Sequence, residues 1–175
     1  QHDAQLKLIA KTIEKKIKSE LEKMLKNERE KYEEFFKTFG IQLKFGIYND
    51  YGMHKDTLKD LLLFTSSKEK KYVTLKEYIQ NMREGQNSIY YACGETVEKI
   101  EMLPQCDAVK EKGYEILYLT DNVDEFALKM MNDYDGKKFV NICDQDLDLS
   151  TEEEKKALEE ENKQFEAMLG EMKDA

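Results

Sequence analysis

The sequence predicts an α/β fold: a long N-terminal helix, a small three-layer α/β/α domain and an acidic C-terminal helix. Three short apolar runs, at residues 89–93, 115–120 and 139–143, have the length of buried strands. One helical pattern lies in each gap between them. Strands that alternate with helices form βαβ units and a parallel sheet. We therefore expect a short, mainly parallel sheet of about three strands, covered by helices on both faces.

The first predicted element is a long amphipathic helix over residues 1–27. Apolar side chains recur at steps of three and four residues on one face, while lysine and glutamate fill the other face. They are Leu6, Ile9, Ile13, Ile17, Leu21 and Met24. Two interpretations stay open. The stripe packs on its own domain, or the helix is a strut between two domains, since some 25 residues rise by about 38 Å.

A second helix, with an aromatic face, is predicted over residues 28–39. Gly40 directly follows its last aromatic residue, in the position where glycine commonly ends a helix. Residues 41–51 are apolar but irregular, with glycine and asparagine among them, and we make no assignment there.

Leucines predict a short helix over residues 57–63, and residues 65–71 have the composition of a polar loop. Thr74, followed three residues later by Glu77, has the pattern of a capping box. Another helix is therefore expected to begin at residue 75.

Helix start and stop signals separate the three predicted strands. After the first strand, Thr96 offers an N-cap, Pro104 the first residue of a second short helix and Gly113 a left-handed C-cap. After the second strand, Asp121-Asn122 with Glu125 suggests a further capping box. The chain is thus expected to pass from strand to strand through helices.

The last predicted helix, at residues 151–175, is acidic and poorly amphipathic. Residues 144–175 hold 12 acidic and 4 basic side chains, a net charge of −8 out of −9 for the whole chain. The apolar positions are sparse, so the helix is marginal alone and needs a surface to dock on. These positions are Leu158, Phe165, Met168, Leu169 and Met172.

Composition argues against several classes of protein. No apolar run approaches the roughly 18 residues of a membrane span, and neither part of the chain has the basic excess that nucleic-acid binding requires. The two histidines, His2 and His54, lie in different segments, so we expect no metal site. The odd number of cysteines, 3 with no C-x-x-C spacing, favours a reduced, cytoplasmic protein.

Two functional interpretations come from the residues alone. A free-standing flavodoxin-like module would bind a small molecule or a protein in the crevice at the carboxyl ends of the strands. That crevice is expected to contain Gly94, Glu95, Thr120 and Asp121. Alternatively, an enzyme would act through Cys106 or through the carboxylates of the crevice, which would need a shifted thiol or carboxyl pKa. The chain lacks the glycine-rich loops that usually cradle phosphates.

Several stretches of the chain are specific enough to compare with a known family. They are 75–95 (LKEYIQNMREGQNSIYYACGE), 114–121 (YEILYLTD), 124–125 (DE) and 135–137 (DGK). Together they resemble the middle region of the heat shock protein 90 chaperones, most of all the bacterial high-temperature protein G branch. The resemblance is collinear from residue 1 to about residue 150. Residues 61–67 are also similar, although Leu63 stands where the family has an arginine, so no polar contact is carried over to that side chain.

The resemblance implies a piece of an ATP-driven, dimeric chaperone. Residues 1–27 would be the helix that links the large and small middle subdomains, 28–148 the small subdomain and 151–175 the start of the C-terminal domain. Gln1 matches a glutamine of the family's γ-phosphate-contacting loop, whereas the arginine of that loop would lie upstream. The chain begins without Met, in what is predicted as mid-helix, and we expect an excised fragment.

The resemblance also implies partners and a role. The longer protein would bind ATP and magnesium, form a homodimer and contact unfolded or partly folded client proteins. This fragment would bind no cofactor and hydrolyse no ATP, but would transmit domain motion between the ATPase and dimerisation domains. Four apolar residues of the last helix are candidates for client contact, or else they pack on the C-terminal domain. They are Phe165, Met168, Leu169 and Met172.

Overall fold

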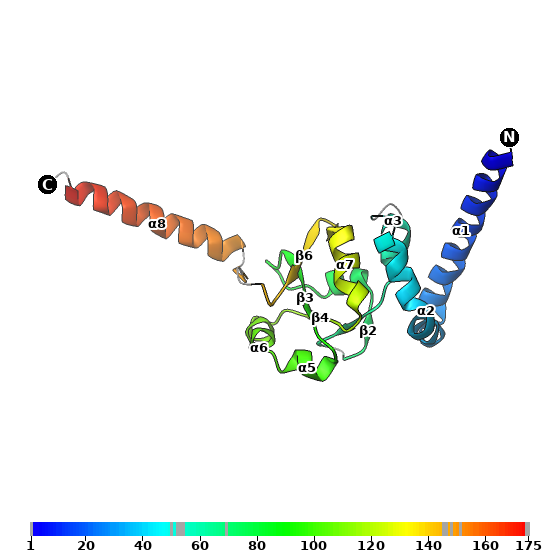
Figure 1. The fold of residues 1–175 in the computed structure, drawn as a ribbon. Coiled ribbons are helices and arrows are strands. Elements are labelled where there is room, and N and C mark those ends of the chain that lie inside the picture. Colours follow the sequence, from blue (N-terminus) through cyan, green and yellow to red (C-terminus); the bar gives the residue numbers. More distant parts are fainter. Residues whose placement is uncertain are drawn as a thin grey trace.

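The computed structural model describes residues 2–49, 51, 55–68, 70–144, 147, 149–150 and 152–173, and it has a helix and sheet domain between two long helices (Figure 1). The helices are α1 (His2–Asn27), α2 (Arg29–Asn49), α3 (Lys55–Leu58), the 3-10 helix η1 (Lys59–Leu61), α4 (Leu75–Gln80), α5 (Val97–Glu101), α6 (Pro104–Glu111), α7 (Asn122–Met131) and α8 (Glu152–Lys173). The strands are β1 (Phe64–Ser66), β2 (Tyr72–Val73), β3 (Ser88–Cys93), β4 (Ile116–Leu119), β5 (Asp133–Tyr134) and β6 (Lys137–Asn141). Among the described residues, none of the helices combines the length and apolar character that crossing a bilayer requires.

The sheet has the strand order β2-β1-β4-β3-β6-β5. The central strand β3 pairs in parallel with both neighbours, so that Tyr91 lies opposite Leu117 on one side and Asn141 on the other. The three predicted strands and their parallel pairing are therefore confirmed. The sheet is larger than about three strands, because β1, β2 and β5 extend it by antiparallel pairing. These additional strands are two or three residues long, too short to produce a clear alternating pattern in the sequence.

Successive residues of β3 face opposite layers. Ile89 and Tyr91 join the core under α2, α4 and α7, whereas Tyr90 and Ala92 join the core under α5 and α6. This alternation buries both faces of the strand, as in other parallel sheets that carry helices on each side. The predicted three-layer α/β/α arrangement is confirmed.

One prediction in the first half of the domain is wrong, and another is confirmed only in part. Helix α2 does not end at Gly40 but continues to Asn49. A Cβ at residue 40 would lie 2.8 Å from the ring of Phe36, so this glycine makes room for an aromatic ring within the helix. The predicted helix over residues 57–63 is helical only as far as Leu61, as α3 and η1, and the chain is extended from Leu62 into β1. The predicted polar loop that follows contains the turn of the β1–β2 hairpin.

The predicted helix caps are mostly confirmed. Thr74 and Glu77 form the capping box of α4, Thr96 caps α5, and Gly113 has a φ of +77° after α6. At the start of α7, however, the backbone N–H of Asp121 donates to Asp124 at 3.0 Å rather than to Glu125.

Helix α1 packs on the domain over only part of its length. Leu21 and Met24 lie against the core, whereas the side chains of Leu6 and Ile13 are more than half exposed. Figure 1 shows the first half of α1 pointing away from the domain, and α8 extending from the opposite end. The apolar stripe is therefore not covered by its own domain in the first half of the helix.

Candidate functional site

A crevice at the carboxyl ends of β3 and β4 contains all four residues predicted there. Gly94 and Glu95 follow β3, and Thr120 and Asp121 follow β4. Because the two strands are parallel, these residues meet at the same edge of the sheet. They line an open hollow of about 650 Å³, which the first turns of α7 close on one side.

The carboxylates at the start of α7 surround a buried lysine. The side chain of Lys44, from α2, is only 6% exposed, and its Nζ lies 2.5 Å from Asp124 Oδ1 and 3.0 Å from Asp121 Oδ2. The rings of Phe36 and Phe64 flank the ammonium group, with centroids 5.4 and 5.6 Å from Nζ. Burial raises the pKa of Asp124, and the charge of Lys44 opposes that rise without cancelling it.

Glu125 also has protein partners within the crevice. Its Oε1 accepts hydrogen bonds from the hydroxyl of Tyr91 at 3.3 Å and the amide of Asn141 at 3.4 Å, and Lys129 Nζ lies 3.2 Å away. Burial, followed by the nearby carboxylate of Glu125, raises the pKa of the Cys93 thiol to about 12. The thiol is therefore protonated at neutral pH.

Cys106 does not have the environment of a nucleophile. It is buried below the sheet, its Sγ donates to the carbonyl of Ile100 at 3.1 Å, and burial raises its pKa. A catalytic thiolate requires a lowered pKa, so the geometry argues against an enzyme acting through this residue. In the described part of the chain, no group of three or more His, Cys, Asp or Glu side chains could hold a metal ion.

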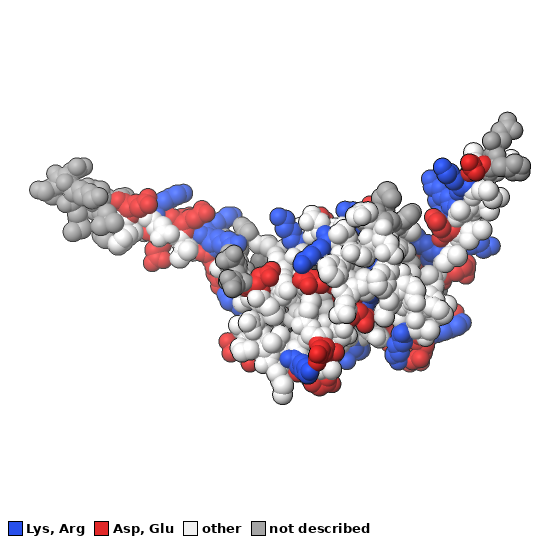
Figure 2. Space-filling view, viewed as in Figure 1, with Lys and Arg blue, Asp and Glu red and all other residues white. Residues whose placement is uncertain are grey.

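An exposed apolar surface adjoins the crevice. Four side chains, between 39% and 49% exposed, form what we call the α2–α7 patch: Ile41, Phe45 and Tyr48 of α2 and Phe126 of α7. The rings of Tyr48 and Phe126 are 5.5 Å apart, so the patch is continuous from one helix to the other. Phe126 also lines the crevice. Figure 2 shows a mostly uncharged surface over α2 and α7, with charged side chains gathered along α1 and α8.

Sequence reasoning did not find the α2–α7 patch. Ile41, Phe45 and Tyr48 are spaced by four and three residues, which is the signal of one helical face. Gly40 hides this signal, because glycine at that position has the pattern of a helix end although α2 continues to Asn49.

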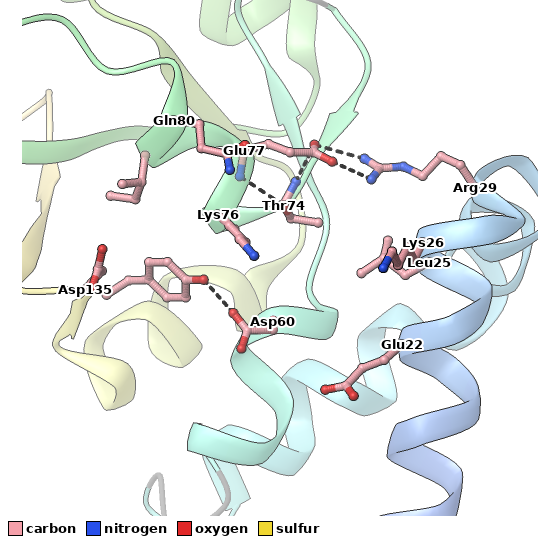
Figure 3. A pocket seen from close by; sticks show the side chains of 12 residues that line it. Glu22, Leu25, Lys26, Arg29, Asp60, Thr74, Lys76, Glu77, Gln80 and Asp135 are labelled. Carbon is pink, nitrogen blue, oxygen red and sulfur yellow. Dashed lines mark hydrogen bonds and ion pairs between the residues drawn. The ribbon is translucent and has the colours of Figure 1, made fainter.

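A second and larger hollow, of about 980 Å³, lies between the last turns of α1 and the helix α4 (Figure 3). The guanidinium of Arg29 donates to both carboxylate oxygens of Glu77, at 2.6 and 3.2 Å, and to the carbonyl of Tyr72 at 3.0 Å. Nearby, the hydroxyl of Tyr134 donates to Asp60 at 2.5 Å. The contacts of Arg29 join the α1–α2 corner to the body of the domain.

Some predicted site residues lie at the ends of the chain. Phe165 of α8 is 56% exposed. Helix α8 includes positions 168, 169 and 172, but the side chains of Met168, Leu169 and Met172 lie outside the described part of the structure, as does Gln1.

Comparisons with known proteins agree on one family. A family model described as Hsp90 protein matches residues 1–175. The chain is 57% identical over 173 residues to Chaperone protein HtpG of Bacillus subtilis, covering 99% of this chain and 28% of that protein. It is 59% identical over 169 residues to the protein of the same name from Clostridium perfringens, covering 96% of this chain and 27% of that protein.

A solved structure has the same fold. The middle domain of a heat shock protein of Plasmodium falciparum is similar with a TM-score of 0.74 and 29% identity, over 81% of this chain and 60% of that one. The chain spans little more than a quarter of the curated relatives, 28% in the case of the Bacillus protein.

Proposed function

Because this chain belongs to the Hsp90 protein family, we propose that it works as part of the middle region of a bacterial molecular chaperone. Support comes from the relatives named as chaperones and from the structural likeness to a heat shock protein's middle domain. A free-standing flavodoxin-like module receives no support from these relatives. The three free cysteines agree with the reducing cytoplasm that we propose as its location.

The proposal divides the chain into three parts. Residues 1–27 connect to a large middle subdomain upstream, residues 28–148 are the small subdomain, and residues 151–175 begin the C-terminal domain. The first half of α1 carries an uncovered apolar stripe, which includes Leu6 and Ile13. This stripe supports the proposal that a subdomain upstream packs against α1.

We further propose that the α2–α7 patch contacts unfolded segments of client proteins. The observation that carries this proposal is the continuous apolar surface formed by Tyr48, Phe126 and their neighbours beside an open crevice. Unfolded chains expose the apolar side chains that folded proteins bury, so such a patch binds them with little dependence on sequence. Phe165 and the other apolar residues of α8 are the second candidate for such contact.

Replacing Phe126 tests the client contact. Fully burying a phenylalanine is worth roughly 1.5–3 kcal/mol, so covering a side chain that is already half buried is worth about 1–1.5 kcal/mol, or roughly a ten-fold change in Kd. We expect Phe126→Ala to weaken binding of a permanently unfolded model protein, such as reduced and carboxymethylated lactalbumin, by about this factor. Fluorescence anisotropy measures the binding.

Met102 provides the matched control. It is 83% exposed and lies between α5 and α6, on the other side of the sheet. Met102→Ala should leave the Kd unchanged within about two-fold, since the substitution removes exposed apolar area outside the patch. Equal effects of the two substitutions would show that the patch is not the client contact.

We propose that ATP and magnesium act elsewhere in the longer, homodimeric protein, and that this chain transmits domain motion. Gln1 would lie in the loop that contacts the γ-phosphate of ATP, at the border between this chain and the large middle subdomain. The test adds this chain, or a version extended upstream through the large middle subdomain, to the isolated N-terminal domain of the same chaperone. Only the extended version should raise ATP turnover, because the missing arginine lies upstream. Stimulation or hydrolysis by this chain alone would contradict the proposed role.

A further inference from the structure

Lys44 occupies an unusual position for a lysine. Its ammonium group is buried between two phenylalanine rings and two carboxylates, those of Asp121 and Asp124. Lysine is rarely buried unless it is paired, and an apolar residue would fill the same space without desolvating a charge. The ammonium group of Lys44 therefore has a role that an apolar side chain in the same space would not supply.

The two ion pairs join α2 to the beginning of α7. Asp121 precedes the first residue of α7, and Asp124 accepts the backbone N–H of Asp121 in the capping box. In the part of the chain that the structure describes, Lys44 supplies the cation of each ion pair between α2 and the start of α7. The ammonium group thus holds the two residues that define where α7 starts.

Lys44 also lies directly beneath the α2–α7 patch. Ile41, Lys44, Phe45 and Tyr48 are spaced as neighbours on one side of a helix, with Lys44 buried and the other three exposed. On α7, Asp124 is buried two residues before the exposed Phe126. The buried ion pairs and the exposed ring contact therefore connect the same two helices at adjacent positions.

We propose that Lys44 is the positioning residue of the client contact, fixing the start of α7 against α2 so that Phe126 stays beside Tyr48. Apolar contacts are not directional and allow two helices to shift, whereas an ammonium held by two carboxylates selects one arrangement. This inference rests on the proposed client contact at the patch, but its structural part can be measured without a client.

The first test compares amide hydrogen exchange in the chain and in Lys44→Met. We expect exchange at residues 124–127, whose amides make the first backbone hydrogen bonds of α7, to accelerate by at least about ten-fold. The amides of β3 and β4 should keep their rates, because only the start of α7 loses its anchor. Lys44→Met combined with Asp124→Asn provides a second variant, since it leaves no buried carboxylate without its cation. Exchange that is unchanged, or raised equally throughout the domain, in the variants that fold would overturn the proposal.

The second test asks whether Lys44 acts through Phe126. Binding of the unfolded model protein is measured for Lys44→Met with Asp124→Asn, for Phe126→Ala and for the combination of all three. We expect Lys44→Met with Asp124→Asn, and Phe126→Ala alone, each to weaken binding by roughly ten-fold. The combination should bind no more weakly than Phe126→Ala, because the effects of residues that act as one unit are not additive. Additive losses would contradict positioning through Phe126. If the unchanged chain did not bind the model protein, the client contact would fail, while the exchange experiment would still decide the role of Lys44.

Discussion

The hydroxyl of Tyr78 offers a quantitative test of how the domain is held together. The side chain is fully buried at the centre of the core. Its hydroxyl donates to the carbonyl of Glu115 at 2.6 Å and accepts from the Gln86 amide and the Tyr90 backbone N–H, each at 3.0 Å. One hydroxyl therefore links α4 to the turn before β3, to β3 itself and to the segment before β4.

Tyr78→Phe removes these three hydrogen bonds while keeping the ring. A buried hydrogen bond contributes about 1 kcal/mol net, so we expect the free energy of unfolding to fall by roughly 2–3 kcal/mol. Urea unfolding followed by circular dichroism at 25 °C measures the change. The control is Tyr48→Phe, the same chemical change at a side chain that is 39% exposed, which should stay within about 0.5 kcal/mol. A loss at Tyr78 as small as that of the control would refute the reasoning from the network.

Three further predictions follow from burial and backbone geometry. Burial raises the pKa of five tyrosines above the ordinary value of 10: Tyr32, Tyr78, Tyr91, Tyr118 and Tyr134. Above that pH the folded state keeps protons that the unfolded state releases, so stability should fall as pH rises beyond about 10, and a urea midpoint that did not move would contradict this. Gly113→Ala and Gly136→Ala should each cost about 1 kcal/mol, because both glycines have a φ near +75°, where alanine is strained. A Cβ at 113 would lie 2.6 Å from Arg83 Nε, but the guanidinium is the end of a flexible side chain that can move aside. A lowered melting temperature measures each loss, and melting temperatures that did not change would contradict the backbone argument. In thiol titration of the folded chain, the exposed Cys143 should react before the buried Cys106. Equal reaction rates would contradict this prediction, because they would mean that the layer of α5 and α6 opens readily.

Local signals in the sequence predicted the centre of the domain well. The strands β3, β4 and β6 follow from short apolar runs, and Thr74 and Gly113 mark helix ends through their own side chain or backbone. These signals depend on residues close together in the chain, and the resemblance to the heat shock protein 90 family added the identity of the domain.

Signals that depend on distant residues were missed. Gly40 has the composition of a helix end, yet the ring of Phe36 occupies the space where a side chain would lie. Nothing near Lys44 predicts its burial, because its partner Asp121 is 77 residues away. The residues of the crevice were predicted because they follow strands directly, whereas the spacing of Ile41, Phe45 and Tyr48 was hidden by the apparent helix end at Gly40.

The corner between α1 and α2 gives the chain the mechanics of a lever. Helix α1 packs on the domain through Leu21 and Met24, and the residues before Leu21 make an arm of about 28 Å at 1.5 Å each. A rotation of roughly 10° about that contact would move the far end by about 5 Å on that arm length. The contacts at the packed end of α1, among them the two hydrogen bonds between Arg29 and Glu77, therefore limit how far its other end could be displaced.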